Sequence, residues 1–166
     1  MDGNDKMQGL EDLYREIILD HYKNPRNSGT LEVPPAHQAD GYNPLCGDEI
    51  SIFVNYDGET ITDIKNSGQG CSISRSSASL MTNAVKGKSI QEARETIKTF
   101  KRLLLLEEDQ SASEPVEIDL RKLGELAALQ GVSKFPARIK CATLAWNTFA
   151  QIIDELEVPP GDSVTQ

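Results

Sequence analysis

The chain has no long hydrophobic run and few aromatic residues. No apolar segment approaches the roughly 20 residues that a helix needs to cross a bilayer, so we expect no membrane insertion. Phe, Trp and Tyr together make up only 5% of the sequence. Hydrophobic residues at 38% and charged residues at 26% are still ordinary for a globular protein. At 166 residues we expect one domain, 1–166, with its core over about 8–155.

Basic residues are also scarce, with 17 Lys and Arg against 26 Asp and Glu and a net charge of −9. Because nucleic-acid binding depends on Lys and Arg to displace counterions, DNA and RNA are not expected partners. Six carboxylates and no basic residue lie between Glu107 and Asp119. We interpret residues 107–118 as a flexible acidic linker and 157–166 as a tail. The alternative for the linker is a docking strip for a basic partner.

A secretory signal is missing as well. Residues 1–6 lack the basic and then apolar pattern of a signal peptide, so we expect a cytoplasmic protein in a reducing environment.

Cysteine occurs only three times, at Cys46, Cys71 and Cys141. An odd number leaves one cysteine unpaired in any internal disulfide scheme, which favours metal ligation or reactivity. The sequence has no phosphate-binding loop, nucleophile elbow or His-Glu-x-x-His motif, which argues against hydrolase chemistry.

Strand signals are concentrated in the first half of the chain. Apolar residues alternate with other residues along 50–55, which is the period of a strand. The Asp-Gly pair at 57–58 predicts a hairpin turn, and residues 60–66 would return as the partner strand with a bulge or a change of register. A third strand is expected around 33–42. These segments predict a small antiparallel sheet.

Helical signals fill much of the remaining chain. Apolar periodicity, caps and breakers predict helices over about 8–22, 72–85, 89–104 and 120–129, and a last helix from near Pro136. Gly131 is expected to close the short helix. The expected core face of the last helix consists of Ile139, Ala142, Thr143, Trp146, Phe149, Ala150 and Ile153. Cys141 lies off that face. The predicted class is therefore α+β, with a small antiparallel sheet and helices packed on one face of it.

The first candidate ligands, Cys46 and Asp48, flank a glycine. Residues two apart in an extended segment project to the same side, and Gly47 allows the backbone to turn tightly. Both side chains can then converge on one ion. The alternative is a small buried cysteine beside an aspartate that serves only the turn.

The other two cysteines lie near helix starts. Cys71 follows a glycine-rich stretch and precedes a predicted helix, where backbone amides and the helix dipole favour a thiolate. Cys141 lies in an early turn of the last helix, with Arg138 three residues before it. Each cysteine can instead be a small core residue. We interpret His21 and His37 as structural or surface residues rather than as ligands.

Three thiolates and one carboxylate would complete the tetrahedral shell of a zinc ion. The candidate donors are Cys46, Asp48, Cys71 and Cys141. Such a shell is anionic even with zinc bound, and a partly buried site carries excess charge only at a cost. Arg138 is the best placed cation to offset that charge and to hold a released cysteine as a thiolate. The alternative for Arg138 is an ordinary surface residue.

Four segments together carry a family resemblance: 14–25, 43–48, 68–74 and 136–141. They resemble the IscU/NifU-like iron-sulfur cluster assembly family, and within it the SufU branch. Scaffold members of that family have a histidine just before the third cysteine, whereas Lys140 holds that place here. The insertion before the last helix also resembles the SufU branch.

The resemblance implies the IscU/NifU-like fold and a zinc-dependent sulfurtransferase that takes persulfide sulfur from a SufS-type, pyridoxal-phosphate cysteine desulfurase. It implies that Cys46, Asp48, Cys71 and Cys141 hold the zinc and that the sulfur passes on to the downstream iron-sulfur assembly machinery. It further implies that a desulfurase histidine replaces Cys46 on the metal, that Cys46 then accepts the sulfur, and that Arg138 steadies its thiolate. Two alternatives stay open: a scaffold that builds an iron-sulfur cluster on the same cysteines, and a structural zinc adaptor without transfer activity.

Overall fold

The computed structural model describes residues 2–44, 47–105 and 124–157. In chain order its elements are α1 (Asp2–Lys23), β1 (His37–Asn43), β2 (Asp48–Tyr56), β3 (Ile61–Gln69), α2 (Ser72–Val85), α3 (Ile90–Leu105), the 3-10 helix η1 (Gly124–Lys134) and α5 (Pro136–Glu157). The predicted acidic linker at 107–118 lies outside the described residues. The predicted tail does too, apart from Glu157, which ends α5.

The sheet has three antiparallel strands in the order β1-β2-β3. The strand predicted over 50–55 is confirmed, and Ile50, Ile52 and Val54 are at most 3% exposed and belong to the core. The alternation is incomplete, because Phe53 between them is buried as well, at 6% exposed. The predicted irregularity in the hairpin is also confirmed, as a register shift between Asn55 and Tyr56.

β1 begins at His37, four residues later than the predicted start at 33. Residues 33–35 form a turn instead. Pro34 and Pro35 have no N–H to donate to a strand ladder, which explains why pairing starts only after them. The sheet is otherwise the one that the sequence predicts.

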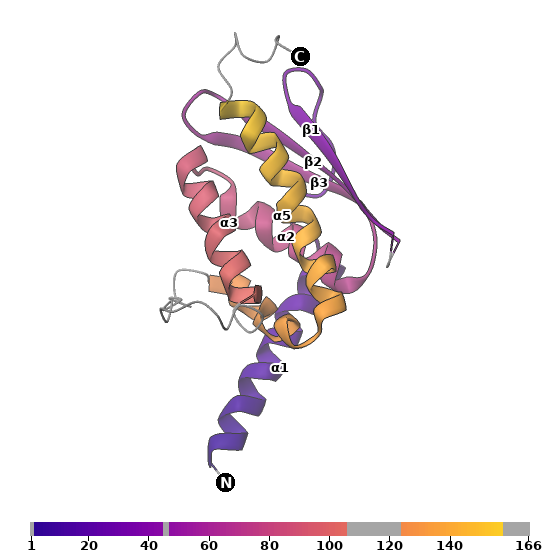
Figure 1. Ribbon diagram of the computed structural model, residues 1–166, viewed down its shortest axis with the longest axis vertical. Helices are drawn as coiled ribbons and strands as arrows, with labels where there is room; N and C mark the ends of the chain where they lie inside the picture. The colour runs from indigo at the N-terminus through magenta and orange to yellow at the C-terminus, as the bar shows by residue number, and fades with distance from the viewer. Residues whose placement is uncertain (1, 45–46, 106–123, 158–166) are drawn as a thin grey trace.

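The helices pack on one face of the sheet, and α5 lies at the centre of the arrangement (Figure 1). α5 contacts β1 and β2 of the sheet as well as α2 and α3. On its predicted core face, the Trp146 ring stacks on Phe100 of α3, with ring centroids 4.1 Å apart. α5 is therefore enclosed by both layers of the fold.

Cys141 lies off the predicted core face of α5, but it is buried all the same, at 0% exposed. α5 has a second buried stripe beside the predicted one. Its members are Cys141, Ala145, Thr148 and Ile152. This stripe is covered because β1 lies very close to α5: a Cβ on Gly41 would clash with Thr148 Oγ1. One-sided periodicity cannot reveal a helix that is packed on two sides.

The other helices agree with prediction in part. α2 has the predicted bounds, and the predicted capping box before α3 is confirmed by reciprocal bonds between Ser89 and Glu92. α1 starts at Asp2 rather than near residue 8, and Figure 1 shows this end extending away from the other elements. The described part of the helix predicted over 120–129 belongs instead to η1, which has Gly131 inside it, and residues 120–123 lie outside the described residues. Four consecutive buried residues, 126–129, give η1 no one-sided pattern.

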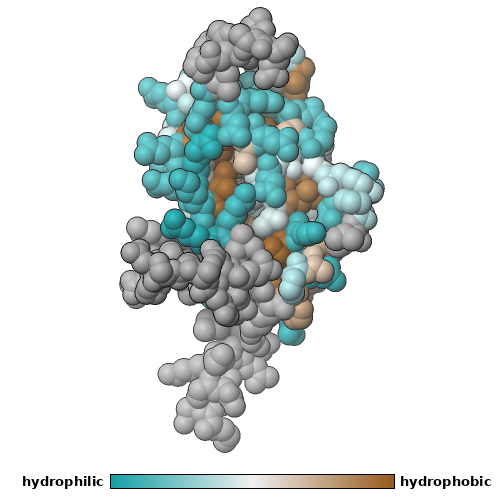
Figure 2. All heavy atoms as spheres, viewed as in Figure 1, coloured by the Kyte–Doolittle hydropathy of each residue, from teal (hydrophilic) through white to brown (hydrophobic). Residues whose placement is uncertain are grey.

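The face of the molecule in Figure 2 is mostly hydrophilic, with apolar residues visible in smaller areas between the polar ones. None of the helices in the described part of the chain is long and apolar enough to span a membrane.

His21 anchors α1 to two other helices and is 0% exposed. Its Nδ1 lies 2.7 Å from Ser79 Oγ on α2, and its Nε2 lies 3.3 Å from Glu125 Oε2 on η1. Ser79 Oγ also accepts the backbone N–H of Arg26 at 2.8 Å. Burial, followed by the charge of Arg26, lowers the pKa of His21 below its ordinary value, against the opposing effect of Glu125.

We predict that acid destabilises the fold partly through His21. A histidine with a lowered folded-state pKa stays neutral in the fold while the unfolded chain binds a proton, so its contribution is lost as the pH falls below about 6.5. His21→Gln should reduce that loss by up to about 1.4 kcal/mol per pH unit. Urea unfolding at about pH 7.5 and about pH 5.5 measures the difference.

The matched control is His37→Gln, because the side chain of His37 is 42% exposed. This variant should keep the pH dependence of the wild type. Equal pH dependence in the wild type and in His21→Gln would contradict the prediction.

Candidate metal centre

Three of the four predicted ligands meet at one point. Asp48 is the first residue of β2, Cys71 directly precedes α2, and Cys141 lies in the second turn of α5. One ligand atom from each residue lies within 4.8 Å of the other two. Cys46 lies outside the described residues, two positions before Asp48 in the sequence.

The carboxylate of Asp48 is fully buried, and only one of its two oxygens has a hydrogen-bond partner among the described residues. Its Oδ1 accepts the backbone N–H of Cys71 at 2.9 Å, which ties the end of the sheet to the start of α2. Its Oδ2 is buried and has no hydrogen-bond partner in the described part of the chain. A buried, unpartnered carboxylate oxygen is costly, and a cation bound there would satisfy it. This is the feature that most directly indicates a metal.

Gly70 makes room for that carboxylate. A Cβ at this position would clash with Asp48 Oδ1 and come within 3.0 Å of its Cγ. Only glycine therefore fits beside Asp48 without displacing it.

The Cys71 sulfur takes the place of the usual oxygen at a helix cap. Cys71 is the N-cap of α2, with extended backbone at φ −71° and ψ 170°, and its Sγ accepts the N–H of Ser74 at 3.4 Å. The unpaired amides and the dipole of α2 present positive charge at this end. This positive charge at the start of α2 favours a negatively charged sulfur at Cys71.

The Cys141 sulfur is buried between α5 and the end of β1. Asn43, the last residue of β1, donates its side-chain Nδ2–H to Cys141 Sγ at 3.7 Å. Asn43 and Asp48 are directly paired across β1 and β2. Asn43 lies in the segment 43–48 that carries the family resemblance, but its residue type alone predicts no role at the metal centre. Its position just before Pro44 and the Cys46 motif is the only signal that pointed to it.

The predicted cation Arg138 lies in the first turn of α5 and is exposed, three residues before Cys141. Lys140 beside it is exposed as well. The two histidines lie elsewhere: His21 contacts Ser79, and His37 Nδ1 lies 3.9 Å from Glu155 Oε2. Neither belongs to the group of converging ligand atoms.

The donor set fits zinc. Two thiolates bound at about 2.3 Å in a tetrahedron lie about 3.8 Å apart, so atoms within 4.8 Å of one another need only a small inward movement. Two sulfurs and one carboxylate oxygen leave room for a fourth ligand, and Cys46 is close in sequence to Asp48. The described residues are therefore suitable as three ligands of a tetrahedral zinc site.

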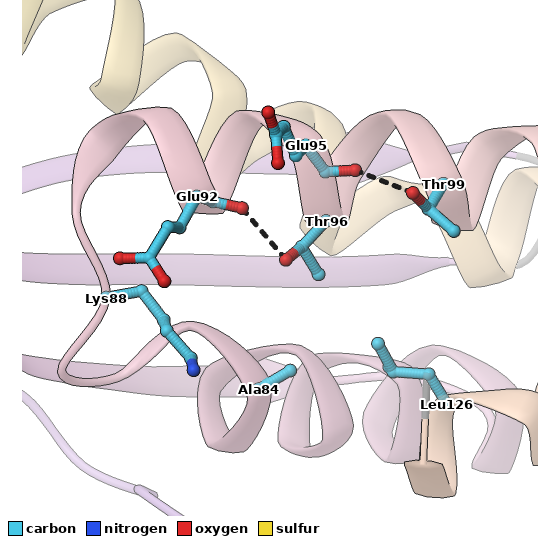
Figure 3. Close-up of a pocket in the computed structure, with 7 residues that line it drawn as sticks. All are labelled: Ala84, Lys88, Glu92, Glu95, Thr96, Thr99 and Leu126. Atoms are coloured by element: carbon cyan, nitrogen blue, oxygen red, sulfur yellow. Dashed lines mark hydrogen bonds between the residues drawn. The ribbon is translucent and has the colours of Figure 1, made fainter. Parts of the chain in front are cut away.

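A hollow of about 360 Å³ between α2, α3 and η1 is a separate feature (Figure 3). It is lined by polar groups, including Lys88, Glu92 and Glu95. The hydroxyls of Thr96 and Thr99 donate to carbonyl oxygens of α3 itself, at 3.0 and 2.9 Å, as Figure 3 shows. Its lining includes no residue of the metal centre.

Residues 13–142 match the family model of the NifU-like N terminal domain. The chain belongs to this family. It is 50% identical over 137 residues to the zinc-dependent sulfurtransferase SufU of Bacillus subtilis, covering 82% of this chain and 86% of the relative. It is also 42% identical over 144 residues to the iron-sulfur cluster assembly scaffold protein IscU of Streptococcus pyogenes, covering 87% and 84%.

Solved structures of family members confirm the fold. The crystal structure of a protein described as a scaffold for the SUF system of Fervidobacterium islandicum, FiSufU, has a TM-score of 0.72 and 34% identity, over 82% of this chain and 93% of that one. The crystal structure of a hypothetical protein has a TM-score of 0.75 and 39% identity, over 86% of this chain and 98% of that one. The predicted IscU/NifU-like α+β fold is thus confirmed.

We predict that Gly70→Ala weakens zinc binding at least about tenfold, because the new methyl group displaces the Asp48 carboxylate; a loss of about 1.4 kcal/mol suffices. Competition with a chromophoric chelator measures the affinity. Gly131→Ala is the control, since a Cβ there meets nothing within 4 Å. An unchanged affinity in Gly70→Ala would show that Asp48 does not hold the metal.

Proposed function

We propose that the protein is a zinc-bound sulfur acceptor in iron-sulfur cluster biogenesis, formed by a single domain. It takes persulfide sulfur from a SufS-type cysteine desulfurase in the reducing cytoplasm and passes it to the downstream assembly machinery. The observation that carries the proposal is Oδ2 of Asp48, which has no partner among the described residues and lies beside the sulfurs of Cys71 and Cys141. The similarity to the zinc-dependent SufU of Bacillus subtilis supports this reading.

The proposed zinc ligands are Cys46, Asp48, Cys71 and Cys141. When bound, zinc supplies the positive charge that keeps the cysteines deprotonated and the Asp48 carboxylate neutralised. The surrounding chain keeps the donors in place: the N–H of Cys71 holds Oδ1 of Asp48, and the N–H of Ser74 holds the Cys71 sulfur.

The proposed acceptor is Cys46. Its thiolate attacks the outer sulfur of the desulfurase persulfide, a new S–S bond forms on Cys46, and the old S–S bond breaks. The electron pair of that bond leaves with the desulfurase cysteine as a thiolate, so the exchange needs no external oxidant. The exposed Arg138 is proposed to stabilise the Cys46 thiolate before the attack.

The surroundings of the other two cysteines favour a ligand role for them. Cys141 is 0% exposed, which prevents a partner's persulfide from reaching it. Cys71 is fixed at the cap of α2 by the N–H of Ser74. A sulfur that must leave the metal and meet a second protein needs more freedom than either position offers.

A scaffold that assembles an iron-sulfur cluster is the second candidate function. The similarity to the IscU scaffold of Streptococcus pyogenes supports it, and the same cysteines are suitable cluster ligands. Lys140 argues against it, because this place belongs to a histidine in the scaffold branch. A structural zinc adaptor without transfer activity is a third candidate.

Metal analysis of protein purified without oxygen separates the first two functions. We expect about one tightly bound zinc per chain, as a single tetrahedral site requires, without iron or labile sulfide. Stoichiometric iron and sulfide would contradict the acceptor function and support the scaffold.

A second test concerns Cys46. After incubation with the desulfurase and cysteine, persulfide-trapping mass spectrometry should find the extra sulfur on Cys46. Cys46→Ser should lose this sulfur and the stimulation of desulfurase turnover, because a hydroxyl cannot form a persulfide. Binding to the desulfurase, measured by calorimetry, is the control and should persist. Unchanged turnover in Cys46→Ser would refute the acceptor role and favour the adaptor.

A further inference from the structure

Asn43 is a buried amide that points at a cysteine sulfur. It is 6% exposed, and its Nδ2 donates to Sγ of Cys141, which lies 98 positions away in the sequence. Buried side-chain amides usually donate their hydrogen bonds to oxygen acceptors. A buried amide directed at one of the proposed zinc ligands therefore calls for a functional explanation.

The position of Asn43 mirrors that of Asp48. These two residues form the last pair between β1 and β2, and residues 44–47, which include Cys46, lie between them in the sequence. Asp48 accepts a bond from Cys71 at the start of α2, while Asn43 donates one to Cys141 of α5. The end of one strand pair thus reaches both described cysteines, each with a different group.

Regular structure holds this amide in place. Asn43 belongs to β1, whose register with β2 continues without interruption from His37 to Asn43. β1 in turn lies against α5 at Gly41, where any side chain would meet Thr148. A donor on a strand that packs this tightly has little freedom to leave the sulfur.

When Cys141 is ionised as a zinc ligand, the contact is that of a neutral donor on an anionic acceptor. Bonds to a charged acceptor are stronger than those between neutral groups, and this one draws electron density from the sulfur. The amide brings no charge of its own, so it leaves the overall charge of the zinc site unchanged. A sulfur that shares its lone pair in this way is a weaker nucleophile.

We propose that Asn43 is a positioning residue that directs Cys141 Sγ toward Asp48 and Cys71 and suppresses the reactivity of that sulfur. Cys141 then remains a metal ligand while Cys46 accepts the sulfur, and in this respect the inference rests on the proposed function. The contact between Asn43 and Cys141 is itself independent of the acceptor's identity.

The test uses two variants of the full chain: Asn43→Leu, which has a similar volume and no donor, and Asn43→Asp, which has the same shape and no N–H. In the cobalt-loaded proteins, the thiolate-to-cobalt charge-transfer band should move to longer wavelength, because the sulfur becomes richer in electrons. In the zinc-loaded proteins, iodoacetamide should modify Cys141 about fivefold faster, the factor that a hydrogen bond of about 1 kcal/mol represents. Peptide mass spectrometry should find Cys71 modified at the wild-type rate.

The matched control is Asn66→Leu. Asn66 is 1% exposed, and its Nδ2 donates to the backbone oxygens of Arg26 and Asn27, four residue pairs along the sheet from Asp48. Its loss should lower the stability of the fold but leave the cobalt band and the alkylation of Cys141 unchanged. This comparison separates a role at the sulfur from a general loosening of the sheet.

Two results would overturn the proposal. One is a cobalt band and a Cys141 alkylation rate that stay at wild-type values in both Asn43 variants. The other is an equal acceleration of Cys141 alkylation in Asn66→Leu. Sulfur transfer to the wild-type protein is measured separately: its absence would refute the proposed function, while the cobalt and alkylation comparison would still decide the role of Asn43.

Discussion

The structure depends on one demanding placement, that of the buried carboxylate of Asp48 beside the sulfurs of Cys71 and Cys141. Three potentially anionic groups in a space this small repel one another and are poorly solvated. One backbone amide satisfies Oδ1, and Oδ2 has no partner among the described residues. The arrangement is physically reasonable for a cation site, and zinc is the ion that best suits two thiolates and a carboxylate.

The fold is arranged so that this placement is possible. The start of β2 supplies Asp48, the cap of α2 supplies Cys71, and the two-sided burial of α5 brings Cys141 to the same point. Two glycines allow the close approaches that this requires. Gly70 leaves room for the carboxylate, and Gly41 lets β1 lie against α5. The remaining core, including the Phe100–Trp146 stack, holds the helices to the sheet.

Members of this family are named as sulfurtransferases and as scaffolds, and both kinds resemble this chain over most of its length. The same set of ligands can serve either chemistry. Here Cys141 is buried under Asn43, and Cys71 is bonded to Ser74. In the division of roles that we propose, these contacts keep Cys71 and Cys141 as ligands and leave the exchange of sulfur to Cys46.

The sequence by itself determined the candidate ligand types, the bounds of α2, the strand at β2 and the family, because these features depend on local spacing and residue chemistry. Only the tertiary structure decided that Cys141 is buried, that Asn43 contacts it and that the segment around Gly131 is a 3-10 helix. The physical reason is the same for all three. Each depends on what a segment packs against, and the contact between Asn43 and Cys141 joins residues 98 positions apart, which no local pattern records.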